Sequence, residues 1–174
     1  MIINKENVYS QEVIDFMTVA VQTCLLLEHT EEQEKQEFTE KLLILLPTLY
    51  VKTRGLSIEP QEEEPYLQRF VTEEEYNSVA ESIKNLLGAD DAYLEVFQED
   101  MRYSLEPITA FVSENLADIY QELKDMAANY QQEDEELMSD AIAACIEAFH
   151  EHWGQKLLNV TRALHAIGEQ NEGE

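Results

Sequence analysis

Residues 135–167 read EELMSDAIAACIEAFHEHWGQKLLNVTRALHAI, and this stretch decides the fold. Its apolar side chains recur at the spacing that places them on one face of an α-helix. This face consists of Met138, Ile142, Cys145, Phe149, Trp153, Val160, Leu164 and Ile167. Because the pattern stays in phase past Gly154, it predicts one long helix from residue 135 to about residue 167. Gly154 costs such a helix about 1 kcal/mol relative to Ala, which suggests a close helix contact or a bend there.

The rest of the chain repeats the helical spacing, and no sustained alternation of apolar and polar residues predicts a strand. The predicted helices lie at residues 10–28, 30–52, 72–88 and 105–130, with a short helical segment at 90–97. The apolar stripe of the first helix consists of Val13, Phe16, Met17, Val21, Cys24 and Leu27. We therefore expect an all-α, multi-helix bundle with the long C-terminal helix as its spine.

Two predicted helices begin with a capping box, in which a Thr hydroxyl and a Glu or Gln side chain satisfy backbone N–H groups of the first turn. Thr30 with Gln33 is the first such pair, and Thr72 with Glu75 is the second. Gly88 follows the last apolar residue of the helix at 72–88 and is predicted to end it in a left-handed conformation. These signals set the predicted helix boundaries.

A length of 174 residues suits one domain, which can bury roughly 70% of the surface that its unfolded chain exposes. Residues 57–65 (SIEPQEEEP) combine two prolines with four glutamates, as exposed loops do. We expect a single helical domain at 1–168 with an exposed connection at about 56–66. Residues 169–174 are expected to form a flexible tail.

The chain is strongly acidic, with 37 acidic and 11 basic side chains and a formal net charge of -26 at pH 7. Nucleic acids and anionic membranes are bound by clustered Lys and Arg, and the sequence has no run of basic residues, so neither partner is expected. The acidity suits a solvated surface, a basic protein partner, or mimicry of the charge of DNA. A basic or neutral protein is the expected partner, and the oligomeric state is left open.

The sequence predicts a cytoplasmic protein. Residues 1–10 (MIINKENVYS) lack the basic start and the apolar stretch of a secretory leader. The longest apolar run, at residues 42–51, has about half the length of a membrane span. Cys24 and Cys145 fall at apolar positions of helical patterns, which suits buried thiols in a reducing compartment.

A candidate polar cluster between helices comprises Asn115, Asp118, Glu122, His152 and Lys156. Asp118 and Glu122 lie on one flank of the helix at 105–130, and helical phase points His152 and Lys156 toward neighbouring helices. A buried ammonium group needs a carboxylate partner, so we expect Lys156 to pair with Asp118 or Glu122. If that pair is internal, the substitution Lys156→Ala should destabilise the protein by about 3–5 kcal/mol.

The chemistry of this cluster has two interpretations. Asp118, Glu122 and His152 could form a metal or acid–base site, or they could belong to a structural polar network between packed helices. Glu147 and His150 have the Glu-x-x-His spacing of di-iron bundles, but one copy is insufficient and its phase points away from the apolar stripe. The sequence has no nucleophile motif, phosphate-binding glycine loop or Cys-x-x-Cys motif, and it predicts no cofactor.

Three segments of the C-terminal half resemble a known family. They are DDAYLEVF at 90–97, ENLADIYQELKD at 114–125 and HEHWGQKLLNVTRALHAI at 150–167. These strings are similar to the signature segments of a bacterial helical family catalogued as domain of unknown function 5063. The resemblance implies a small bacterial helical domain, packing roles for Tyr120, Trp153 and Gly154, and no particular activity.

Two functional hypotheses follow. The acidic surface and the lack of catalytic motifs favour a soluble binding or adaptor module that acts through protein–protein interaction. The alternative is a metal-dependent or acid–base enzyme with its site at Asp118, Glu122 and His152.

Overall fold

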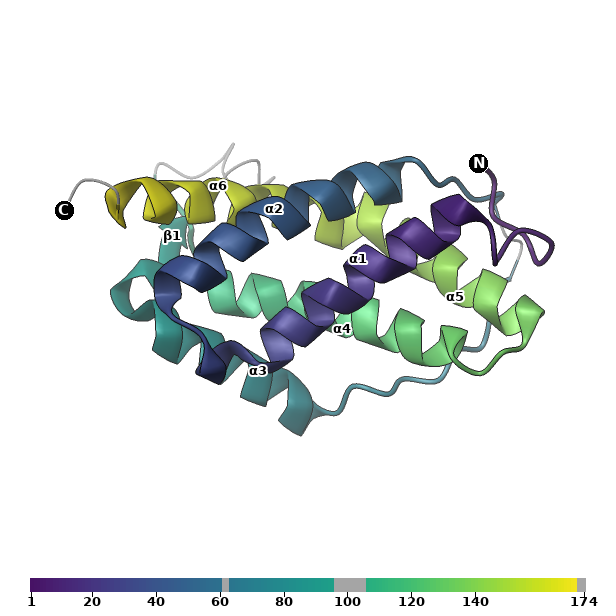
Figure 1. Cartoon of the computed structure of the whole chain (residues 1–174), viewed down its shortest axis with the longest axis horizontal. Coiled ribbons are helices and arrows are strands. Elements are labelled where there is room, and N and C mark those ends of the chain that lie inside the picture. Colours follow the sequence, from purple (N-terminus) through teal and green to yellow (C-terminus); the bar gives the residue numbers. More distant parts are fainter. Residues whose placement is uncertain (61–62, 96–105, 172–174) are drawn as a thin grey trace.

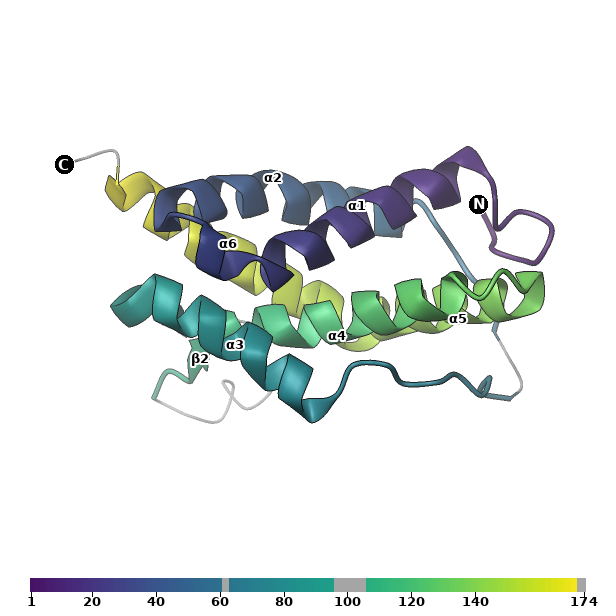
Figure 2. The same cartoon turned by 60° about the horizontal axis from the view of Figure 1, so that its bottom comes forward.

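The helices of the chain lie in two layers (Figures 1 and 2). The computed structural model describes residues 1–60, 63–95 and 106–171. One layer holds α1 (Gln11–Glu28), α2 (Lys35–Arg54) and α6 (Gly154–Asn171). The other holds α3 (Glu73–Leu87), α4 (Val112–Tyr130) and α5 (Glu135–Ala148). The predicted all-α bundle is therefore confirmed, and no helix in the described ranges is long and apolar enough to cross a membrane.

α4 is the central element of the bundle, because it contacts α1, α3, α5 and α6. Its side chains Leu116, Ile119 and Leu123 are fully buried. Burying each of these side chains contributes roughly 1.5–3 kcal/mol to the stability of the fold. Since α4 contacts helices of both layers, its buried side chains hold the two layers together. The sequence pattern placed the C-terminal helix in this position instead.

The predicted long C-terminal helix is confirmed, and it contains one irregular turn. Between α5 and α6, residues Phe149–Trp153 form a π-helical turn in which the Gly154 N–H donates to the Phe149 carbonyl. A Cβ atom at Gly154 would lie 2.6 Å from that carbonyl oxygen and 2.9 Å from Cε2 of the Phe149 ring. The close approach at Gly154 is therefore to the preceding turn of its own helical run instead of to another helix, and at this turn the chain passes from one layer to the other (Figure 2).

The predicted start of the second helix at Thr30 is wrong. α2 begins at Lys35, and Thr30–Glu32 form a separate 3-10 turn. The Thr30 hydroxyl donates to the Leu27 carbonyl at 2.9 Å, so it completes the end of α1 instead of capping α2. The second capping box is confirmed, because Thr72 and Glu75 exchange both hydrogen bonds at the start of α3.

A short antiparallel ribbon replaces two predicted helical segments. β1 (Ala92–Leu94) pairs with β2 (Thr109–Phe111), so the expected helix at 90–97 and the expected helix start at 105 are wrong. Residues 96–105 lie outside the described part of the chain. Gly88 ends α3 at a positive φ of 57°, but its ψ of -125° differs from the predicted left-handed helical conformation. Strands of three residues are too short for an alternating pattern to show in the sequence.

The connection from α2 to α3 is anchored where it begins. Leu56 is buried, and Ser57 exchanges backbone hydrogen bonds of 2.8 Å with Met1 and Ile3. Residues 65–71, here termed the strap, then run along the layer of α4 and α5 to reach α3 (Figures 1 and 2). At the other end of the chain, α6 continues to Asn171, past the predicted end near residue 167.

Candidate functional site

Asp118 joins three helices. The Lys156 ammonium group from α6 donates to Asp118 Oδ2 at 2.5 Å, and the Tyr76 hydroxyl from α3 donates to Asp118 Oδ1 at 2.6 Å. Burial raises the pKa of Tyr76, and the hydrogen bond to Asp118 raises it further. The structure thus contains the expected Lys156–Asp118 pair, but the side chains are 38% and 34% exposed instead of internal.

The expected inward orientation of His152 is wrong. Its side chain is 72% exposed, and its ion-pair partner is the adjacent Glu151 at 3.7 Å. His152 lies within the π-helical turn, where an extra residue shifts the phase that a regular helix would have. Among the described residues, no group of three or more His, Cys, Asp or Glu side chains could hold a metal ion. Asp118, Glu122 and His152 therefore form no metal-binding group, although the charges of Asp118 and His152 both act on the pKa of Glu122.

Asn115 belongs to a separate network beside the ribbon. Its side-chain amide donates to the Tyr93 hydroxyl at 2.5 Å. Next to it, Asp91 is buried and accepts hydrogen bonds from the Ser113 backbone N–H at 2.7 Å and from the Ser113 hydroxyl at 2.8 Å. Asp91 therefore caps the first turn of α4 across 22 residues of sequence, a role that local sequence patterns do not reveal.

The packing residues of the family segments are buried as expected. The Trp153 indole N–H donates to the Cys145 carbonyl at 2.9 Å, and the Tyr120 hydroxyl donates to Glu28 Oε1 at 2.9 Å. Glu147 and His150 are exposed, as their helical phase predicted. Cys145 is a buried free thiol, and so is Cys24.

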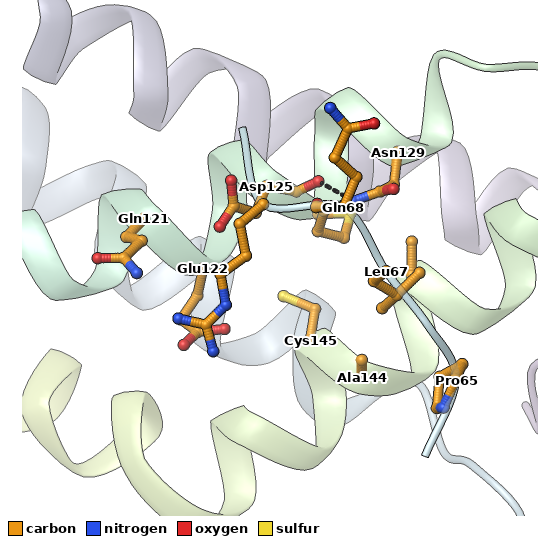
Figure 3. Close-up of a pocket in the computed structure, with 12 residues that line it drawn as sticks. Pro65, Leu67, Gln68, Gln121, Glu122, Asp125, Asn129, Ala144 and Cys145 are labelled. Carbon is orange, nitrogen blue, oxygen red and sulfur yellow. Dashed lines mark hydrogen bonds between the residues drawn. The ribbon is translucent and has the colours of Figure 1, made fainter. Parts of the chain in front are cut away.

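A polar pocket of about 240 Å³ lies between the strap, α4 and α5 (Figure 3). Its lining residues are Pro65, Leu67, Gln68, Arg69, Gln121, Glu122, Asp125, Met126, Asn129, Ala141, Ala144 and Cys145. Asp125 Oδ1 accepts the backbone N–H groups of Phe70 and Val71 at 2.7 and 2.8 Å. The Asn129 amide donates to the Gln68 carbonyl at 2.9 Å. These bonds hold the strap over α4 and shape the pocket.

Glu122 is a carboxylate of the pocket whose pKa is shifted by its surroundings. Burial raises the pKa of its carboxyl group, and the charge of Asp125 raises it further, while Arg69 and His152 oppose the shift. Within the described residues, no side chain or backbone N–H donates a hydrogen bond to this carboxylate. Helical phase in the sequence pointed to Glu122 but not to Arg69 or the strap, because their proximity to Glu122 depends on tertiary structure.

A second surface gathers exposed apolar side chains from α1 and α2. We define the apolar face by Ile14, Val21 and Leu25 of α1 and by Ile44 and Val51 of α2, all of which are exposed. Val21 was expected to be buried, so that part of the predicted α1 stripe is wrong. Ile44 and Val51 are 70% and 67% exposed, which is unusual for aliphatic side chains of this size.

Two open grooves of about 630 and 460 Å³ flank α1 on this face. Leu25, His29 and Ile44 help line the larger groove, and Ile14, Val21 and Tyr130 help line the smaller one. Gln22 borders both grooves, so they adjoin along the exposed ridge of α1.

Comparison with known proteins agrees with the resemblance found in the sequence. A crystal structure of protein BF1032 from Bacteroides fragilis, a structural genomics target, has a TM-score of 0.81 and 35% sequence identity to this chain. The match covers 92% of this chain and 94% of that one. No functionally curated protein matches. The model of the DUF5063 family, described as a domain of unknown function, matches residues 7–170, and the chain therefore belongs to that family.

Proposed function

We propose that this chain is a protein-binding module that holds an amphipathic helix with basic flanks on its apolar face. The observation that carries this proposal is the exposure of five large aliphatic side chains on α1 and α2 in a chain of net charge -26. Exposed apolar side chains that gather on one surface are typical of interaction sites. The free, buried Cys24 and Cys145 and the relative from Bacteroides fragilis support a cytoplasmic, bacterial setting.

The spacing of the apolar face suits a helical ligand. Ile14, Val21 and Leu25 follow one another at intervals of seven and four residues, and Ile44 and Val51 are seven apart. Residues at these intervals form a row along one side of a helix. Grooves between such rows accept the apolar stripe of a partner helix, which presents its own side chains at matching intervals.

Charge favours a basic partner. No charged residue occurs at 16–27 in α1 or at 42–51 in α2. Glu32 and Glu37 line the larger groove, where Lys41 is already paired with Glu37 at 2.6 Å. A partner helix with Lys or Arg beside its apolar stripe would meet these carboxylates, whereas a second copy of this chain would bring another charge of -26.

The test is fluorescence anisotropy with a synthetic amphipathic helix of Leu and Lys, labelled at one end. The full chain should bind this peptide more tightly than a scrambled peptide of the same composition. The double variant Leu25→Glu, Ile44→Glu should weaken binding by at least about tenfold. The matched control is Tyr66→Glu, Leu158→Glu, which adds the same charge at exposed apolar positions outside the apolar face and should bind like the wild type.

Two results would contradict the proposal. One is equal binding of the scrambled peptide together with no effect of the Leu25 and Ile44 substitutions, which would indicate attraction by charge alone. The other is a stable dimer in analytical ultracentrifugation that the same double variant dissociates, since a second copy would then cover the apolar face.

A further inference from the structure

The polar pocket holds two opposite charges that do not neutralise each other. Glu122 from α4 and Arg69 from the strap both line it, and the charge of Arg69 lowers the pKa of Glu122 against the larger effect of burial. Nevertheless, no ion pair or hydrogen bond joins them in the described part of the structure. Glu122 is half-buried and Arg69 is exposed. An acid and a base that line one cavity without pairing leave a place for a ligand that carries both charges.

We infer that the polar pocket binds a free α-amino acid, with the Glu122 carboxylate holding the ligand ammonium group and the Arg69 guanidinium holding the ligand carboxylate. This site is separate from the apolar face on α1 and α2. A guanidinium binds a carboxylate through two parallel hydrogen bonds, which orients the ligand as well as attracting it.

Two other polar side chains of the pocket, Asp125 and Asn129, hold the strap, whereas Glu122 accepts no hydrogen bond within the described residues. Asp125 uses Oδ1 for the backbone N–H groups of Phe70 and Val71. Asn129 uses its amide N–H groups for the carbonyls of Gln68 and Asp125. Figure 3 shows Glu122 and Cys145 facing the space beneath the strap.

The size and walls of the pocket restrict the ligand. Its volume of about 240 Å³ is below the roughly 300–1,000 Å³ of pockets that hold drug-sized molecules. Leu67, Met126, Ala141 and Ala144 supply apolar wall. A short aliphatic side chain would fit against this wall, so we expect alanine or valine to bind better than a charged or aromatic amino acid.

Ligand binding would also remove an energetic penalty of the empty pocket. A half-buried carboxylate without a hydrogen-bond donor is poorly solvated, and an ammonium partner restores both the charge balance and the hydrogen bonds. The ligand therefore gains affinity from a group that destabilises the unliganded protein.

The experiment is isothermal titration calorimetry of the full chain with L-alanine, L-valine, n-propylamine and propionate. The amino acids should bind saturably and at least about tenfold more tightly than the amine or the acid. Glu122→Gln and Arg69→Gln should each weaken amino-acid binding by at least about tenfold. The control Glu114→Gln removes a carboxylate from the exposed side of the same helix and should leave binding unchanged.

Failure of the amino-acid inference can be distinguished from failure of the proposed peptide binding, because different variants affect the two experiments. Leu25→Glu, Ile44→Glu should bind amino acids like the wild type, and Glu122→Gln should bind the amphipathic peptide like the wild type. Circular dichroism and thermal unfolding of each variant show whether it is folded. An absence of saturable amino-acid binding to the wild type would overturn the inference. Binding of propylamine as tight as that of alanine, with no loss in Arg69→Gln, would overturn it as well.

Discussion

The apolar face and the polar pocket differ in almost every physical respect. The apolar face belongs to α1 and α2, is open, and lacks charged residues at 16–27 and 42–51. The polar pocket belongs to α4, α5 and the strap, is concave, and contains Arg69, Glu122 and Asp125.

This difference shows how one helical bundle can offer two kinds of recognition. Aliphatic side chains at helical intervals favour another helix, because they provide area and shape without fixed polar contacts. Unpaired charges in a small cavity favour a small polar ligand, because each charge demands a specific partner. Substitutions can therefore disturb the two regions separately or together.

Gly154→Ala should disturb both regions, because Gly154 lies where the C-terminal helix passes from α5, beside the pocket, to α6, beside α2. The new Cβ atom would lie 2.6 Å from the Phe149 carbonyl oxygen, and backbone cannot give way easily. We expect the free energy of unfolding to fall by about 3 kcal/mol, which is the upper end of the range typical of substitutions that overpack a core. Urea denaturation followed by circular dichroism measures this loss.

The control for that substitution is Gly168→Ala in the same helical run. A Cβ atom there would lie 3.4 Å from Cδ1 of Leu43, an ordinary contact with a flexible side chain. This substitution should stabilise the protein by about 0.4–1 kcal/mol, since Ala restricts the unfolded chain more than Gly does. Equal effects of the two substitutions would show that the turn at Phe149 tolerates a side chain.

Asp125→Ala should release the strap and disturb the polar pocket alone. Asp125 Oδ1 accepts two backbone N–H groups, and hydrogen bonds to a charged acceptor make a net contribution of about 1.5–3 kcal/mol each. Because the side chain is partly exposed, we expect a loss of about 2 kcal/mol in total. Hydrogen exchange of the Phe70 and Val71 amides should accelerate in the same variant.

Asp125→Asn provides the matched comparison for the strap. The Asn side chain keeps an oxygen in the Oδ1 position but loses the negative charge, so it should retain part of the stability that Ala loses. Peptide binding to the apolar face should be unchanged in both variants. Unchanged amide exchange in Asp125→Ala would mean that other contacts hold the strap.

Lys156→Ala should cost about 1 kcal/mol, well below the loss of about 3–5 kcal/mol expected for an internal pair. The ion pair with Asp118 is more than a third exposed, so water can replace the ammonium group. Tyr76 continues to donate to Asp118 after the substitution. Thermal unfolding of Lys156→Ala and Lys156→Met checks this, and a loss above about 3 kcal/mol for Ala alone would restore the buried interpretation.

Helical periodicity predicted most of the fold. The positions of α1, α3, α5 and α6, the capping box at Thr72 and the special role of Gly154 all depend on residues close together in sequence, and each is confirmed. The ribbon of β1 and β2 was missed, because it forms between segments far apart in the chain. Local patterns report such pairing only when the strands are long enough to alternate.

The candidate site could be predicted only in part. A carboxylate partner for Lys156 was predicted as Asp118 or Glu122, and it is Asp118; helical phase and charge complementarity narrowed the choice to these two residues. His152 was placed wrongly, because the π-helical turn shifts its phase. Asp125 and Arg69 were missed as parts of a pocket, because the strap reaches α4 through backbone N–H groups, which have no sequence signature.

Glu122→Gln should have the smallest effect and the clearest pH dependence. The pKa of Glu122 is raised above its usual 4.5, so the folded state holds a proton that the unfolded state releases. Stability attributable to this group is therefore present at low pH and is lost as pH rises from about 4.5 through the folded-state pKa. Glu122→Gln should consequently be more stable than the wild type at neutral pH and equally stable below that window.

The gain in stability of Glu122→Gln at neutral pH should stay under about 1 kcal/mol, because the pocket is open to water. The control Glu114→Gln shows how much of this gain comes from reducing the overall negative charge. Thermal unfolding across the pH window measures both variants. If L-alanine occupies the pocket, it should raise the unfolding temperature of the wild type and of Glu114→Gln but not of Glu122→Gln. Identical pH profiles for the two variants would mean that Glu122 is as well solvated as an ordinary surface carboxylate, and the contrast between the two regions would then reduce to hydrophobicity alone.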